Sequence, residues 1–181
     1  MLKSEAEYEK SSGMRVADGV RELLLAASPD FIARLQSAVE PDPWKFGFAI
    51  LHKIDNGAGG SRATWTGKPA RVDEPGGKSI NVLIGMCGFT GAPDSNGVVE
   101  IAYGISRAYE GKGYATEAAQ ALVEFASKRD GVTTICAHTL PEINASTRIL
   151  EKCGFKKIGA MVDSENNSVW RWERNCAIRT S

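Results

Sequence analysis

A glycine-rich stretch is the part of the sequence whose residue types point most directly to chemistry. It reads EGKGYATEAAQAL and spans residues 110–122. Glycines let the main chain come close to a ligand, and the first amides of a following helix lack partners within that helix and carry partial positive charge. Such amides bind anions, most naturally a phosphate. The stretch therefore predicts a phosphate-binding turn at the start of a helix.

Two common nucleotide motifs do not fit this turn. A P-loop needs Gly-x4-Gly-Lys-Ser/Thr, but Lys112 is followed by Gly113, and no glycine stands five positions before Gly111. A dinucleotide fingerprint reads G-x-G-x-x-G/A, and counted from Gly111 its last position is Thr116. The spacing therefore argues against both nucleoside triphosphates and dinucleotides.

The elements on either side of the turn form a predicted strand–helix–strand unit. Residues 97–105 (GVVEIAYGI) and 132–140 (VTTICAHTL) have the apolar, β-branched composition of strands. Between them, apolar residues recur at intervals of three and four from Ala115 to about Arg129, which predicts an amphipathic helix. Such a unit normally makes its strands parallel neighbours through a right-handed crossover.

The remaining patterns predict an α/β fold with a mixed, mostly antiparallel sheet flanked by helices. The segment 55–79 is rich in glycine and reads either as a long loop with a function or as a tolerated insertion in a frayed hairpin. We expect an acidic helical cap over 1–43 and a core domain over 44–181. The other predicted elements are helices over 16–27, 29–39 and 145–152, and strands over 44–54, 80–91, 156–162 and 168–174.

The composition excludes several classes of protein. The 22 Lys and Arg balance the 22 Asp and Glu, which argues against a bulk electrostatic grip on nucleic acid or anionic lipid. The longest apolar run, Leu23–Ala27, is far short of the roughly 20 residues of a membrane span. The four cysteines show no CxxC spacing, and His52 and His138 lack metal-ligand spacing. We therefore expect a cytoplasmic protein without a metal, a nucleic-acid partner or a membrane partner.

Two segments together resemble a known family. The run EIAYGISRAYEGKGYATEA, residues 100–118, is followed about 25 residues later by NASTRILEKCGF. This arrangement resembles the GNAT superfamily of acetyl-CoA-dependent N-acetyltransferases, in particular the branch similar to ribosomal-protein alanine N-acetyltransferases, over about residues 44–175. The resemblance implies a GNAT-like sheet in which the two parallel strands splay apart and leave a slot for the pantetheine arm of coenzyme A.

The resemblance also implies which residues hold acetyl-CoA. The family pattern Gln/Arg-x-x-Gly-x-Gly/Ala falls here on Glu110 to Ala115, and Glu110 departs from the usual Gln or Arg. Its carboxylate would be unfavourable beside a pyrophosphate unless it points away or pairs with Lys112 or Arg107. The residues implied to bind the coenzyme are Ile105, Arg107, Glu110, Gly111, Lys112, Gly113, Tyr114, Ala115, Thr116, Asn144 and Ser146.

Acetyl transfer to an amine needs a group that accepts the amine proton and one that protonates the departing thiolate. A main-chain N–H near Ile105 would polarise the carbonyl. Glu100 is the candidate base, because a carboxylate in an apolar strand is costly without a role or a partner; an exposed face or pairing with a basic residue is the alternative. Ser146 is the candidate acid. Asn144 also suits a helix N-cap, and Tyr103 an acceptor pocket or the core.

The sequence thus predicts an enzyme that moves an acetyl group from acetyl-CoA to a primary amine by direct transfer in a ternary complex. The acceptor is either a small molecule or a protein N-terminus. The alternative is a non-catalytic coenzyme A sensor or scaffold, toward which Glu110 points. Exposed edge strands leave both a monomer and a homodimer open.

Overall fold

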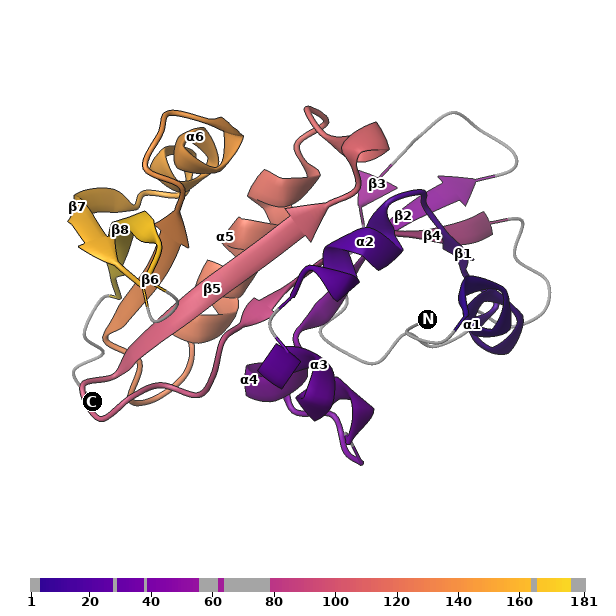
Figure 1. Cartoon of the computed structure of the whole chain (residues 1–181), viewed down its shortest axis with the longest axis horizontal. Helices are drawn as coiled ribbons and strands as arrows, with labels where there is room; N and C mark the ends of the chain where they lie inside the picture. Colours follow the sequence, from indigo (N-terminus) through magenta and orange to yellow (C-terminus); the bar gives the residue numbers. More distant parts are fainter. Residues whose placement is uncertain are drawn as a thin grey trace.

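The computed structural model describes residues 4–27, 29–37, 39–55, 62–63, 79–163 and 166–176. These residues form one eight-stranded sheet with helices on both faces (Figure 1). The sheet order is β3-β2-β4-β5-β6-β8-β7, and β1 lies beside β4. The strands are β1 Arg15–Val16, β2 Phe48–Asp55, β3 Arg62–Ala63, β4 Ser79–Phe89, β5 Val98–Ile105, β6 Thr134–Thr139, β7 Lys156–Val162 and β8 Ser168–Asn175. The helices are α1 Glu5–Ser12, α2 Val20–Leu25, α3 Pro29–Gln36, α4 Pro43–Phe46, α5 Tyr114–Ser127 and α6 Ala145–Lys152, with one 3₁₀ turn at Arg107–Tyr109.

The two central strands part after a short parallel ladder. β5 pairs with β6 from Val98–Thr134 to Glu100–Cys136 only, although β5 continues to Ile105 and β6 to Thr139. Apart from β1 with β4, the other strand pairs are antiparallel. The prediction of a mixed, mostly antiparallel sheet that splays between two parallel strands is confirmed. Figure 1 shows the ribbons of β5 and β6 diverging, with α6 beyond the end of β6.

The crossover helix α5 anchors this centre because its apolar stripe is buried. Leu122 and Ala126 are fully buried, as is Ile135 on β6 and Ile84 on β4. Burying a side chain of the size of Leu or Ile contributes about 1.5–3 kcal/mol. The start of α5, which carries the predicted phosphate-binding turn, is therefore fixed relative to the open ends of β5 and β6.

The N-terminal elements differ from the prediction. The helix expected from residue 16 begins at Val20, because Gly19 adopts a left-handed φ of 83°, and Val16 lies in β1. The strand expected from Trp44 begins at Phe48. Asp42 caps the short helix α4 instead, since its carboxylate accepts from the Trp44 N–H at 2.9 Å. Helix α1 was not predicted.

A close main-chain approach fixes the turn after α4. Gly47 has a φ of 66°, and a Cβ there would lie 2.6 Å from the Cys87 oxygen. A Cβ on Gly88 would lie 2.6 Å from the Gly47 Cα. Glycine is therefore required at both positions, and this contact holds the turn against the C-terminal end of β4.

Most of the segment 55–79 lies outside the described residues. Within it, Arg62 and Ala63 pair antiparallel with Lys53 and His52 of β2, as a hairpin requires. The division into a cap over 1–43 and a core over 44–181 stays a prediction. In the described part of the chain, no helix has the length and apolar character needed to cross a membrane.

Candidate active site

The glycine-rich turn presents a row of main-chain donors. The 3₁₀ turn ends at Glu110, Gly111 and Gly113 adopt left-handed φ values of 72° and 91°, and α5 then begins without a side-chain cap. None of the N–H groups of residues 111–116 donates to an acceptor in the described part of the chain. These amides lie at the positive end of the α5 dipole and are the donors that the predicted anion site would use.

Within the described part of the chain, Glu110 forms no ion pair with Lys112 or Arg107. The Lys112 ammonium donates to the Ala108 oxygen at 2.9 Å and lies 4.9 Å from the centre of the Tyr109 ring. Glu110 and Arg107 are exposed. The cation of Lys112 is thus held at the turn, and the carboxylate of Glu110 is solvated.

Tyr114 contributes through its main chain. Its ring is buried, and its hydroxyl lies 2.8 Å from Nδ1 of His52 on β2. The side chain therefore belongs to the core and does not line a coenzyme channel, whereas the N–H remains in the turn. Ala115 and Thr116 are half-buried in the first turn of α5, and the Thr116 oxygen lies 3.9 Å from the Cys153 sulfur.

The end of β5 presents further main-chain donors toward β6. The Thr90 N–H donates to the Glu100 oxygen at 3.0 Å, and the Ser106 N–H to the Ile84 oxygen at 2.7 Å. The even-numbered main-chain groups of β5 therefore face β4. Those of Tyr103 and Ile105 face β6, beyond the last ladder pair. The Ile105 side chain is buried, so its contribution to the site is the main-chain N–H.

Glu100 stands where the two strands begin to part, and it has a partner. Its Oε1 lies 2.7 Å from Nδ1 of His138 on β6, and its Oε2 lies 3.4 Å from the Thr90 hydroxyl. The carboxylate is 32% exposed and the imidazole 21%. With the proton on Nδ1, the ring donates to the carboxylate. Both alternatives therefore remain compatible with the geometry, since the partner is a histidine and the carboxylate is still accessible.

Only one of the two ring nitrogens of His138 has a partner, namely Nδ1 with Glu100. Its Nε2 is buried and has no hydrogen-bond partner among the described residues.

On the neighbouring β8, Arg171 donates to Glu173 at 2.7 Å. Burial, followed by the negative charge of Glu100, raises the pKa of the Cys136 thiol to about 11. That thiol therefore stays protonated at neutral pH.

Asn144 and Ser146 open helix α6 on the opposite side of the gap. The side-chain Oδ1 of Asn144 accepts from the Thr147 N–H at 3.2 Å, and the Thr147 hydroxyl accepts from the Asn144 N–H at 3.1 Å. Asn144 is therefore an N-cap, as its type suggested. Ser146 follows in the first turn and is half-buried.

Tyr103 reaches across the gap toward Ser146, a contact that sequence analysis missed. Its hydroxyl lies 3.5 Å from the Ser146 main-chain oxygen. Burial raises the pKa of the Tyr103 hydroxyl well above its ordinary value, so the group stays protonated. The sequence left open whether Tyr103 belongs to an acceptor pocket or to the core, because the pattern does not show where the β5–β6 ladder ends.

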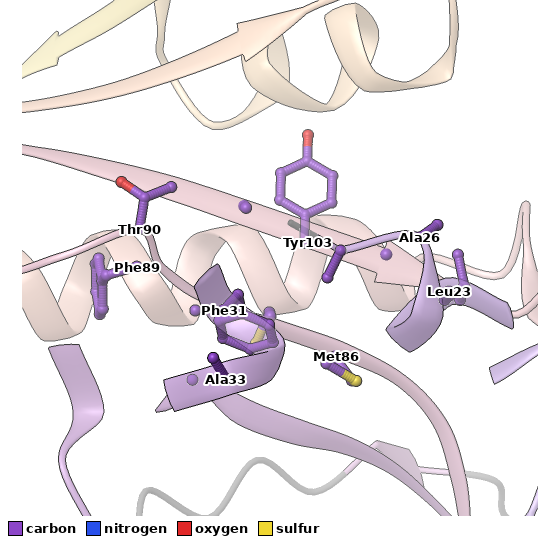
Figure 2. Close-up of a pocket in the computed structure, with 14 residues that line it drawn as sticks. Leu23, Ala26, Phe31, Ala33, Met86, Phe89, Thr90 and Tyr103 are labelled. Carbon is purple, nitrogen blue, oxygen red and sulfur yellow. The ribbon is translucent and has the colours of Figure 1, made fainter. Parts of the chain in front are cut away.

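A cavity of about 940 Å³ opens on the face of the sheet that α2 and α3 cover (Figure 2). Its floor is the C-terminal part of β4 and of β5. Thr90, which lines it, contacts Glu100. The lining residues are Leu23, Ala26, Ala27, Phe31, Ala33, Gly47, Met86, Cys87, Gly88, Phe89, Thr90, Ala102, Tyr103 and Gly104. No sequence motif marks them, because they come from five separate segments.

The structure thus places the sequence-predicted residues around one gap. Residues 107–116 lie after the end of β5, Asn144 and Ser146 start α6, and Glu100 lies where the gap begins. All four cysteines are free thiols. Among the described residues, no three or more His, Cys, Asp or Glu side chains gather in a way that could hold a metal ion.

Comparison with known proteins assigns this arrangement to a family. Uncharacterized N-acetyltransferase YjdG of Bacillus subtilis (strain 168) is 40% identical over 73 residues, 40% of this chain and 44% of that protein. Uncharacterized N-acetyltransferase p20 of Bacillus licheniformis is 35% identical over 88 residues, 49% of each protein. This chain thus spans about half the length of the curated relatives it matches.

A solved structure and a family model agree with these relatives. Ribosomal-protein-S5-alanine acetyltransferase from Vibrio fischeri matches with a TM-score of 0.50 and 17% identity over 55% of this chain and 58% of that one, a likeness of fold alone. The sequence model of the acetyltransferase (GNAT) domain matches residues 26–156, more than half of the chain. The chain therefore belongs to the GNAT acetyltransferase family.

Proposed function

We propose that this chain transfers an acetyl group from acetyl-CoA to a primary amine, directly and in a ternary complex. The observation that carries the proposal is the row of unpaired N–H groups over residues 111–116 at the end of a strand whose own N–H groups face a gap. An anion site next to an open strand edge suits a ligand that joins a pyrophosphate to an amide-containing arm.

The residues present fit coenzyme A. The amides of residues 111–116 would hold the pyrophosphate, and the exposed Arg107 and the held cation of Lys112 add positive charge nearby. The N–H groups of Tyr103 and Ile105 would meet the pantetheine arm and the thioester oxygen. The Asn144 side-chain oxygen already accepts from Thr147, so this residue would contact the coenzyme through its side-chain NH₂ group. When bound, acetyl-CoA supplies an acyl carbon open to attack by an amine.

Glu100 would accept the amine proton. Its Oε2 is on the Thr90 side, next to the cavity, while His138 holds Oε1 at 2.7 Å. A fixed carboxylate beside the acceptor is what general-base catalysis requires. His138 then acts as a positioning residue, because it orients the carboxylate without touching the substrate.

His138→Leu is expected to lower kcat by about tenfold or more, because the Glu100 carboxylate loses its hydrogen-bond donor. His138→Asn is expected to recover much of this loss, since an amide nitrogen can replace Nδ1 as donor to Glu100. Steady-state kinetics and the pH profile of kcat check both variants. Equal losses in the two variants, with unchanged pH profiles, would reduce His138 to a packing residue.

Ser146 would protonate the departing thiolate, since its hydroxyl sits in the first turn of α6 on the far side of the gap. Ser146→Ala is expected to slow kcat about tenfold with little change in acetyl-CoA affinity. Single-turnover kinetics with Ser146→Ala and Tyr103→Phe check this assignment. If Ser146→Ala is fully active and Tyr103→Phe is slow, the proton donor is Tyr103 instead. The Tyr103 hydroxyl is 3.5 Å from the Ser146 main-chain oxygen.

A direct assay tests the proposal as a whole. Release of free thiol from acetyl-CoA is followed with a panel of small primary amines and peptides with free N-termini, and calorimetry measures coenzyme A binding. Turnover with any of them supports the enzyme. Binding without turnover favours a coenzyme A sensor or scaffold, the second candidate, to which Glu110 in place of the usual Gln or Arg points. We expect a monomer or a homodimer.

A further inference from the structure

We propose that the acceptor is a primary amine carried on an apolar aliphatic or aromatic body, bound in the cavity under α2 and α3 with its amine toward Thr90 and Glu100. This inference rests on the proposed function and names its substrate class. A volume of about 940 Å³ accommodates a small molecule of this kind.

The chemistry of the walls favours an apolar guest. Among the described lining residues there is no charged side chain, and the only hydroxyls are those of Thr90 and Tyr103. In Figure 2 the Tyr103 ring points away from Phe31 and Met86, and its hydroxyl lies near Ser146 across the gap. The Tyr103 hydroxyl is therefore directed out of the cavity, and Thr90 is left as the polar group at its edge.

The shape of the cavity supports the same conclusion. Small residues on β4 and β5 make its floor, namely Gly88, Ala102 and Gly104. Leu23, Phe31 and Met86 stand around that floor and are only half-buried (Figure 2). An apolar ligand would remove these side chains from water, which is favourable, at about fourfold in affinity for each methylene buried.

The polar end of the site is equally specific. Thr90 lines the cavity and lies 3.4 Å from Glu100, so one amine can reach the proposed base from inside. A second ammonium at the other end of the acceptor would meet only apolar walls among the described residues. Burial of an unpaired charge is costly, so diamines and polyamines should be poor acceptors.

A panel matched in length and differing in charge tests this inference on the full chain. We expect kcat/KM to rise about fourfold per methylene from propylamine to hexylamine. Hexylamine and phenethylamine should exceed 1,6-diaminohexane by about tenfold or more. A diamine that matches hexylamine, or an alanine-initiated peptide that surpasses every alkylamine and arylalkylamine, overturns the proposal. Acetylation of polar amines alone would support the proposed acetyltransferase function and contradict the proposed class of acceptor. Absence of coenzyme A binding in calorimetry would contradict both proposals.

Two variants test whether the preference for apolar amines arises in this cavity. Ala33→Glu puts a carboxylate at the exposed edge of the cavity and should shift the hexylamine-to-diamine ratio by about tenfold toward the diamine. Ala6→Glu, the same change on the exposed face of α1, is the control and should leave the ratio unchanged. Ala102→Leu fills the floor and should lower kcat/KM for hexylamine more than for propylamine. Unchanged preferences in both cavity variants, with normal folding by circular dichroism, would contradict the assignment.

Discussion

Glu100→Gln is expected to lower kcat by about 10²- to 10⁴-fold, the contribution of a positioned general base. The amide keeps the size of the carboxylate and can still hydrogen-bond to His138, but it cannot take up the amine proton. The affinity for acetyl-CoA should be unchanged, because the amides of residues 111–116 lie at the other end of β5. Steady-state kinetics with the best acceptor, beside calorimetry with acetyl-CoA, measures both quantities.

Glu124→Gln is the matched control for this variant. Glu124 is an exposed residue of α5 that pairs with Lys128 at i and i+4, so its replacement should cost little stability and no activity. Glu100→Gln with turnover close to that of Glu124→Gln would take Glu100 out of the mechanism. The contact with His138 would then be only a hydrogen bond between β5 and β6.

The part of the site that could be predicted from sequence is the part that is local in the chain. The amides of residues 111–116 belong to one turn, and the helix after them carries its own periodicity. The capping role of Asn144 could be predicted for the same reason, because its partner, Thr147, is three residues away. A main-chain anion site needs no distant partner, so its motif is sufficient.

The cavity and the partner of Glu100 could not be predicted, because both depend on segments far apart in sequence. Glu100 meets His138 only because the short β5–β6 ladder brings position 138 two residues beyond the last pair. The cavity combines α2 and α3 with the small residues of β4 and β5, none of which carries a motif. A lone histidine in an apolar strand gives no sign of the carboxylate next to it.

The fold shows the same division. The strand–helix–strand centre could be predicted because its apolar periodicity agrees with its burial. In the C-terminal hairpin that agreement does not extend to β7, where Ile158, Met161 and Val162 are exposed. The predicted boundaries of the N-terminal elements were wrong where a single residue overrides the apolar pattern. Gly19 delays the start of α2, and Asp42 caps a helix over residues that read as a strand. Local propensity is a weak guide where a cap or a glycine contact such as Gly47–Gly88 decides the conformation.

Gly113→Val is expected to weaken coenzyme A binding by about 5- to 150-fold. Gly113 holds a φ of 91° at the start of α5, a conformation that costs a β-branched residue about 1–3 kcal/mol. The turn can relieve that strain by changing its main-chain torsions, and the N–H groups of residues 111–116 would then no longer point to one anion. Each 1.4 kcal/mol lost from binding is a tenfold change in Kd, which calorimetry measures.

Gly131→Val separates this effect from simple destabilisation. Gly131 has a φ of 82°, and a Cβ added there, as at Gly113, meets nothing within 4 Å. The two substitutions therefore impose similar strain, but Gly131 follows the far end of α5, about 20 Å away along a helix of this length. If both variants lose similar thermal stability but only Gly113→Val binds coenzyme A more weakly, the turn itself holds the coenzyme. Equal affinities in the two variants would mean that the pyrophosphate is bound elsewhere, because a ligand held by these amides must respond to their orientation.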